Sequence, residues 1–148
     1  MRTQIIRKTL SALFIALVAP ICLYGQASTA DTQSSQVAAK FVGVWQGELA
    51  GLPSVILTLA KDDGTLQGTL VLNGINRDGG TPHIAVHETH VLLHPNLSGM
   101  TLSFTVKGVR PSRTTMDFTV EQTSDTSAKL HCLNCGDDAP TVEITKLN

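Results

Sequence analysis

From residue 41 to the C-terminus, apolar residues recur at every second position rather than at every third or fourth. In one segment Met100, Leu102, Phe104 and Val106 alternate with polar residues, most of which are Thr or Ser. Alternation with this period turns one face of a strand toward the core and the other toward solvent. The pattern therefore predicts half-buried antiparallel strands and an all-β fold.

Clusters of Gly, Asn, Asp and Pro separate the alternating segments and predict turns. The predicted turns are 62–64, 73–74, 77–80, 95–99 and 135–140. They divide the chain into about eight strands. These are 41–50, 54–61, 65–72, 83–93, 100–107, 114–121, 128–133 and 141–147. Short connections favour an up-and-down meander. Such a meander can close into a barrel that is filled by side chains or holds one small ligand. A β-sandwich with the same connectivity is the alternative.

The first predicted strand contains the only Trp of the chain, Trp45, between Gly43 and Gly47. Glycine weakens a strand interior, so two glycines here predict that another part of the chain approaches the backbone closely. We expect Trp45 to close one end of the barrel.

This opening is similar to the first hairpins of calycin-type barrels, the group of lipocalins, fatty-acid-binding proteins, avidins and nitrobindin-like haem proteins. The residues that carry the resemblance are Gly43-x-Trp45, Leu57-Thr58-Leu59 and Asp63-Gly64-x-Leu66-x-Gly68-Thr69-Leu70. More narrowly, the chain resembles small exported bacterial β-barrel proteins of unknown function. The resemblance implies a barrel with a ligand inside. Biotin is not expected, because avidin-type sites need several tryptophans and a tyrosine. A haem site would need an inward His, whereas His131 has the outward phase.

The N-terminus has the parts of a secretory signal peptide. Arg2, Arg7 and Lys8 precede the apolar run 10–19, and small residues follow up to Ala30. The predicted divisions are a signal peptide over 1–30, a flexible polar leader over 31–40 and a single β-barrel domain over 41–148. We expect a periplasmic or secreted protein. No membrane span is expected after cleavage, because the apolar run is shorter than the ~20 residues of a spanning helix.

Cys132 and Cys135 are the only thiols that remain after residue 30. An even pair in an exported chain predicts a disulfide. Here the bond would close a very short loop at the mouth of a hairpin.

Four histidines, His83, His87, His90 and His94, are candidate ligands for a metal ion such as Zn²⁺ or Cu²⁺. Their spacing would align them on a helix, but the flanking residues favour a strand. On a strand, His83 and His87 face one side while His90 and His94 face the other, unless a bulge re-aims them. Solvent-facing histidines are the simpler interpretation.

The apolar residues at the inward-facing positions of the strands form one apolar wall. Its candidate ligand-cavity residues are Trp45, Leu57, Leu59, Leu70, Leu102, Phe104, Met116 and Phe118. These side chains either fill the barrel or line a cavity for a small apolar molecule.

The sequence carries no Gly-x-Ser-x-Gly elbow, phosphate-binding loop or His-Glu-x-x-His motif. We therefore expect no enzyme and no cofactor. Beyond residue 30 the chain has eight basic and twelve acidic residues, scattered without a basic stripe. Nucleic acid is consequently not an expected partner. The predicted function is binding of a small apolar ligand in the barrel, or of an envelope partner at its rim. The alternatives are a structural module with a packed core, and metal binding through the histidine segment.

Overall fold

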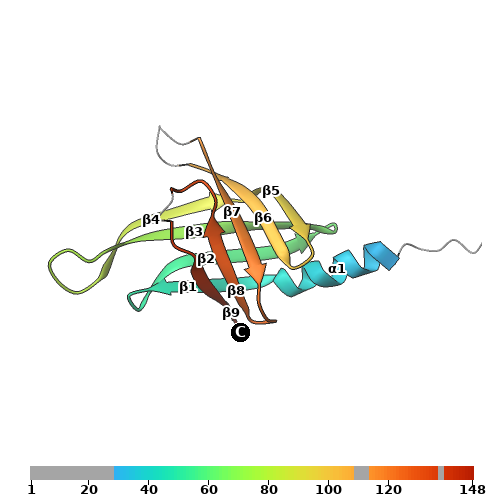
Figure 1. Cartoon of the computed structure of the whole chain (residues 1–148), viewed down its shortest axis with the longest axis horizontal. Helices are drawn as coiled ribbons and strands as arrows, with labels where there is room; N and C mark the ends of the chain where they lie inside the picture. The colour runs from blue at the N-terminus through green and yellow to red at the C-terminus, as the bar shows by residue number, and fades with distance from the viewer. Residues whose placement is uncertain (1–28, 109–113, 137–138) are drawn as a thin grey trace, which may run out of the picture.

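The computed structural model describes residues 29–108, 114–136 and 139–148, in which one helix precedes nine strands (Figure 1). The elements are α1 (Thr29–Phe41), β1 (Gly43–Leu49), β2 (Leu52–Asp62), β3 (Thr65–Asn76), β4 (His83–Val91), β5 (Leu93–Ser98), β6 (Thr101–Lys107), β7 (Thr115–Gln122), β8 (Ser127–Cys132) and β9 (Val142–Leu147). The predicted signal peptide, apart from its last two residues, lies outside the described residues. Within the described ranges, no helix combines the length and the apolar character needed to cross a membrane.

The strands form a single sheet in the order β4-β3-β2-β1-β9-β8-β7-β6-β5. Every strand pairing within the described residues is antiparallel, and the sheet curls into a half-barrel (Figure 1). The prediction of an all-β antiparallel meander with a barrel-like curl is confirmed. The chain makes one continuous sheet rather than the two packed sheets of a sandwich.

The two ends of the sheet, β4 and β5, are consecutive in the chain and separated only by Leu92. In the described part of the chain, β4 pairs with β3 alone and β5 with β6 alone. The Leu92 N–H donates to the carbonyl of Gly68 on β3, with an N···O distance of 3.0 Å. The ends of the curled sheet therefore meet at this corner.

Of the turns predicted from composition, 73–74 is wrong because it is strand, and 95–99 is wrong except for Gly99, because residues 95–98 are strand. The segment 95–99 belongs largely to β5, where the register shifts between Leu93 and Asn96 and His94 has a φ of 51°. This irregularity lets one chain segment change its partner from β3 to β6. Asn73-Gly74 lies inside β3, beside a second register shift between Gly74 and Ile75. Bulges use the same residue types as turns, so composition alone confuses the two.

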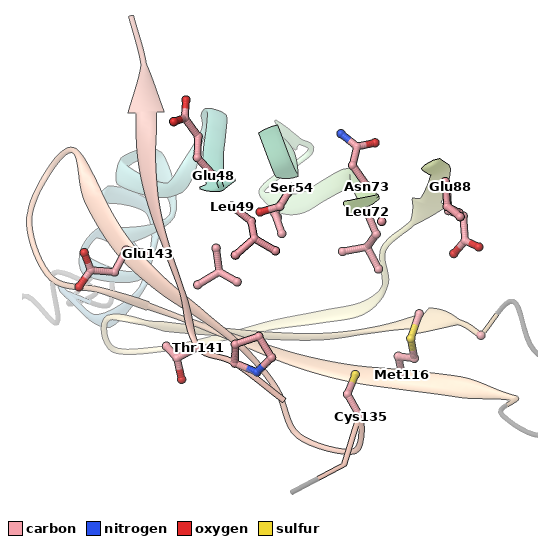
Figure 2. Close-up of a pocket in the computed structure, with 16 residues that line it drawn as sticks. Glu48, Leu49, Ser54, Leu72, Asn73, Glu88, Met116, Cys135, Thr141 and Glu143 are labelled. Carbon is pink, nitrogen blue, oxygen red and sulfur yellow. The ribbon is translucent and has the colours of Figure 1, made fainter. Parts of the chain in front are cut away.

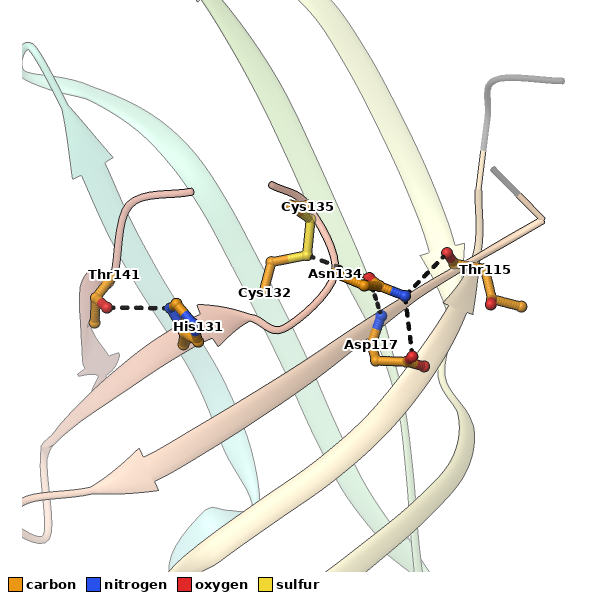
Figure 3. The surroundings of a disulfide bond; sticks show 7 residues. All are labelled: Thr115, Asp117, His131, Cys132, Asn134, Cys135 and Thr141. Atoms are coloured by element: carbon orange, nitrogen blue, oxygen red, sulfur yellow. Dashed lines mark hydrogen bonds between the residues drawn. A yellow bond between two sulfur atoms is a disulfide. The ribbon is translucent and has the colours of Figure 1, made fainter. Parts of the chain in front are cut away.

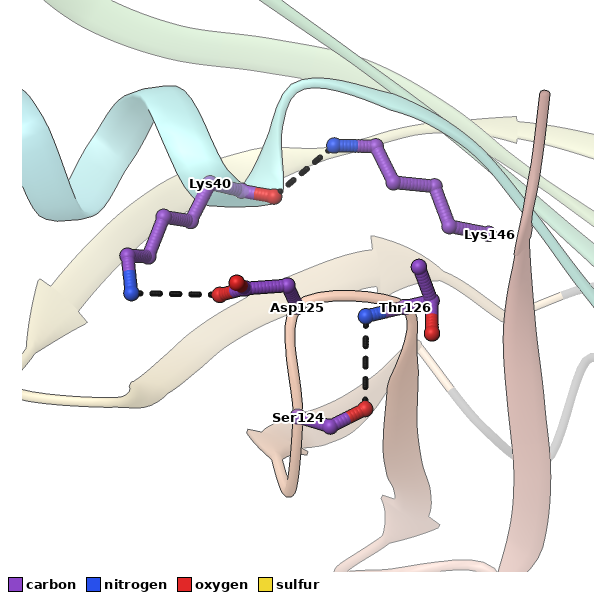
Figure 4. Close-up of polar contacts among 5 residues, drawn as sticks. All are labelled: Lys40, Ser124, Asp125, Thr126 and Lys146. Atoms are coloured by element: carbon purple, nitrogen blue, oxygen red, sulfur yellow. Dashed lines mark hydrogen bonds and ion pairs between the residues drawn. The ribbon is translucent and has the colours of Figure 1, made fainter.

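The segment 31–40, predicted to be a flexible polar leader, is helical, and Phe41 ends the helix instead of starting a strand. Two carbonyls at the end of α1 accept hydrogen bonds from the sheet. The Trp45 indole N–H donates to Phe41 O at 2.8 Å, and Lys146 Nζ donates to Lys40 O at 3.0 Å. Lys40 itself forms an ion pair with Asp125 at 3.2 Å (Figure 4). The hydrogen bonds to Phe41 O and Lys40 O satisfy carbonyl groups that the end of a helix leaves without partners.

The glycines on either side of Trp45 have the predicted role. A Cβ on Gly47 would lie 2.6 Å from Cγ1 of Val142, and one on Gly43 would lie 2.7 Å from Cε of Lys146. The backbone of β1 therefore lies directly against β9. Trp45 between them is fully buried.

Candidate functional site

One end of the half-barrel encloses a partly open cavity of about 720 Å³. This volume lies within the ~300–1,000 Å³ that is usual for small-molecule sites. One side of the cavity comes from β1 to β4, and the other comes from Gly108 just after β6, from β7 and β9, and from the segment between β8 and β9. The lining residues are Glu48, Leu49, Ser54, Val55, Leu72, Asn73, Gly74, Val86, Glu88, Gly108, Met116, Cys135, Pro140, Thr141, Val142 and Glu143.

Apolar side chains from several elements face the hollow. Figure 2 shows Leu49 of β1 and Leu72 of β3 on one side, with Met116 of β7 and Cys135 across from them. Leu49 is 43% exposed although it is a large apolar residue. The cavity therefore keeps apolar surface accessible to solvent.

Most polar side chains of the lining are engaged within the protein or directed away from the hollow. Ser54 Oγ donates to Gly47 O at 3.2 Å, and Asn73 Nδ2 donates to Pro53 O at 2.8 Å. The carboxylates of Glu48 and Glu143 point away from the centre of the cavity in Figure 2.

Glu88 differs from these groups because its neighbour on the inner face of β4 is a buried histidine. The cross-strand partners of Glu88 and His90 are Leu72 and Leu70, which also face inward. The His90 side chain is 7% exposed, and its Nε2 lies 3.6 Å from Glu88 Oε2. At that distance the contact is not a hydrogen bond, and Nε2 has no hydrogen-bond partner within the described ranges.

The predicted cavity residues separate into two groups. Met116 lines the cavity, whereas Trp45, Leu57, Leu59, Leu70, Leu102, Phe104 and Phe118 are buried in the hydrophobic core. The rings of Phe104 and Phe118 stack in this core, with their centroids 5.6 Å apart. Large inward side chains thus fill the middle, as a small barrel allows. The hollow lies at the end, where the inner face of β4 carries Val86 and Glu88.

The four predicted metal-ligating histidines are not brought together. His83 and His87 are both exposed, and His87 Nδ1 lies 2.8 Å from Asn73 Oδ1; the register shift pairs them with Asn76 and Asn73, which lie on opposite faces of β3. His90 faces inward, and His94 is exposed at the irregular start of β5. Across the described ranges, no group of three or more His, Cys, Asp or Glu side chains is arranged to hold a metal ion.

Cys132 and Cys135 form a disulfide, with their Cα atoms 5.6 Å apart. The turn that it closes is fastened to β7 through Asn134 (Figure 3). Asn134 Oδ1 accepts from the Asp117 N–H, and Nδ2 donates to Asp117 Oδ2, both at 3.0 Å. Because Cys135 lines the cavity, the disulfide and Asn134 together position one part of its wall.

Breaking the Cys132–Cys135 bond is expected to lower the free energy of unfolding by about 2 kcal/mol. The closed loop spans only four residues, so the entropic gain is smaller than that of a 15-residue loop. Thermal unfolding with and without reductant measures the effect. The double variant Cys132→Ser/Cys135→Ser is the control, because its melting temperature must not respond to reductant. Equal melting temperatures of the unaltered protein under the two conditions would contradict the prediction.

We compared the chain with protein-family models, with curated proteins and with solved structures, and none of them matches.

Proposed function

We propose that this protein is an exported, non-catalytic, calycin-like barrel that binds a small apolar ligand in the cavity at its open end. The observation that carries the proposal is the apolar wall around about 720 Å³ of accessible space. Ligand sites typically combine such a wall with a few polar groups that orient the ligand. Here Glu88 is the polar group that remains near the hollow.

The core supports a ligand at the end of the barrel rather than along its axis. Trp45, Leu57 and Leu70 are fully buried and pack in the core cluster. A ligand along the axis would have to displace such side chains, which costs their burial energy. A ligand at the end would instead cover surface that is now exposed, including Leu49.

Export is supported by two independent features of the chain. The first 30 residues have the charge and hydropathy pattern of a signal peptide. The Cys132–Cys135 disulfide suits an oxidising compartment such as the periplasm or the exterior.

Filling the cavity is expected to abolish ligand binding without unfolding the protein. Leu49→Trp adds a large side chain on the cavity wall, at a position that is already 43% exposed. We expect the affinity for diphenylhexatriene, an uncharged hydrocarbon that fluoresces in apolar surroundings, to fall at least about tenfold, equivalent to ~1.4 kcal/mol. Fluorescence titration of the purified protein measures this affinity.

Leu147→Trp is the matched control for this experiment. It makes the same substitution at a residue of similar exposure, 47%, at the opposite end of β9 from the cavity-lining Val142. Its affinity for diphenylhexatriene should equal that of the unaltered protein. If the unaltered protein does not bind the hydrocarbon, or if both variants weaken binding equally, the cavity is not a ligand site. The packed structural module is then the better account.

A further inference from the structure

We infer that the apolar ligand of this cavity carries a hydrogen-bond-donating head group, an amine or a hydroxyl rather than a carboxylate, which Glu88 and His90 receive. The inference rests on the proposed function and names the class of ligand for the same site. It follows from three properties of the two side chains: their shared face, the unpaired Nε2 of His90 and the charge of Glu88.

Glu88 and His90 are two residues apart on β4 and therefore project from the same face. That face is the inner one, because Glu88 lines the cavity beside its cross-strand partner Leu72. His90 lies one step deeper, next to Leu70, which is fully buried. A ligand whose apolar part lies against Leu72 would thus bring its polar end to these two residues.

The hydrogen-bonding capacity of His90 Nε2 is not used within the described part of the protein, while Glu88 is partly exposed at the cavity wall. His90 Nε2 is buried without a hydrogen-bond partner, and the nearest Glu88 oxygen is 3.6 Å away. Buried polar atoms in folded proteins are nearly always paired, and an unpaired one costs free energy. A head group that bonds to Glu88 at the cavity wall and reaches His90 Nε2 directly behind it would recover that energy.

The charge of Glu88 selects the type of head group. An ionised carboxylate only accepts hydrogen bonds, so its ligand must donate. An ammonium supplies three donors, whereas a hydroxyl donates its one hydrogen to Glu88 and can accept from His90 Nε2 when that nitrogen carries the proton. A carboxylate ligand would instead bring two like charges together. None of the lining residues in the described ranges is a Lys or Arg that would offset this repulsion.

Competition among three ligands with the same chain tests the inference. Octylamine, 1-octanol and octanoate are each titrated against diphenylhexatriene bound to the purified protein. We expect the amine and the alcohol to displace the hydrocarbon at concentrations about tenfold lower than octanoate, because hydrogen bonds to a charged group are the stronger class. Glu88→Gln should remove most of the difference between octylamine and octanoate.

Glu121→Gln is the matched control, because Glu121 is an exposed carboxylate on β7 that does not line the cavity. It removes the same charge and should leave the ligand preference intact. Equal displacement by all three ligands, preference for octanoate, or equal effects of the two variants would overturn the inference. In each of these cases diphenylhexatriene still binds and the proposed function stands. Absence of hydrocarbon binding would overturn both.

Discussion

Replacing Trp45 with Ala is expected to lower the free energy of unfolding by about 3–5 kcal/mol, the range for removing a large aromatic residue from a core. Trp45 is fully buried and is the largest of the fully buried side chains. Its indole also donates to Phe41 O and lies under the Lys146 ammonium, which is 5.4 Å from the ring. Denaturant unfolding followed by circular dichroism measures the loss, since the variant has no other Trp to report by fluorescence.

The variant Trp45→Phe distinguishes two contributions of Trp45 to stability: the packing of its ring in the core and the hydrogen bond of its indole to the end of α1. It keeps an aromatic ring in the core but removes the donor to Phe41 O, so we expect a smaller loss, about 1–3 kcal/mol. Hydrogen exchange at the end of α1 should accelerate in this variant, because that carbonyl would no longer be tied to β1. A cost below about 1 kcal/mol for Trp45→Ala would show that the indole is not the centre of the core.

The strands were predictable because their signal is local. A strand with one buried face shows its burial in its own alternation, as in β6, where Leu102, Phe104 and Val106 are buried. The β2–β3 hairpin was equally predictable from the sequence, because the turn at Asp63-Gly64 joins strands whose register pairs Asp62 with Thr65. Neighbouring pairs then follow from short connections, which gives the meander.

The features that the sequence did not reveal depend on contacts between distant parts of the chain. The end of α1 is held by Asp125 and Lys146, which lie 85 and 106 residues from Lys40. β5 begins one residue after Leu92, whose N–H bonds to Gly68 O on β3 where the ends of the sheet meet. No pattern within the helix or within β5 itself carries this information.

Of the eight residues that the sequence suggests for a ligand cavity, only Met116 lines the cavity of the structure. Inward phase identifies which side chains face the interior, and most of those named are buried. The inward phase does not show where side chains fill the interior and where they leave a cavity. His90 was considered as a metal ligand, whereas the structure places it beside Glu88 on the cavity side of β4. The short spacing of these two polar residues on one strand face was the signal available for this pair.

Adding a single methyl group at Gly68 is expected to be among the most damaging substitutions in the sheet. A Cβ at this position would lie 2.1 Å from Thr58 O and 3.1 Å from Cδ2 of Leu59. Thr58 O belongs to the backbone of β2, which is paired with β3, so it cannot move without disturbing the ladder. We expect Gly68→Ala to lower the free energy of unfolding by about 3 kcal/mol or more, at the upper end of the usual cost of overpacking.

The damage should extend to the corner that joins the ends of the sheet, because Gly68 O accepts the hydrogen bond from Leu92. Amide exchange at Leu92 is expected to accelerate in Gly68→Ala beyond what the global loss of stability explains. Gly80→Ala is the matched control, since a Cβ there meets no atom within 4 Å. Its unfolding free energy should change by less than about 0.5 kcal/mol. Similar effects of Gly68→Ala and Gly80→Ala would mean that the backbone of β2 shifts at Thr58 to accommodate the added methyl group. The close approach of β2 and β3 would then not stabilise this corner.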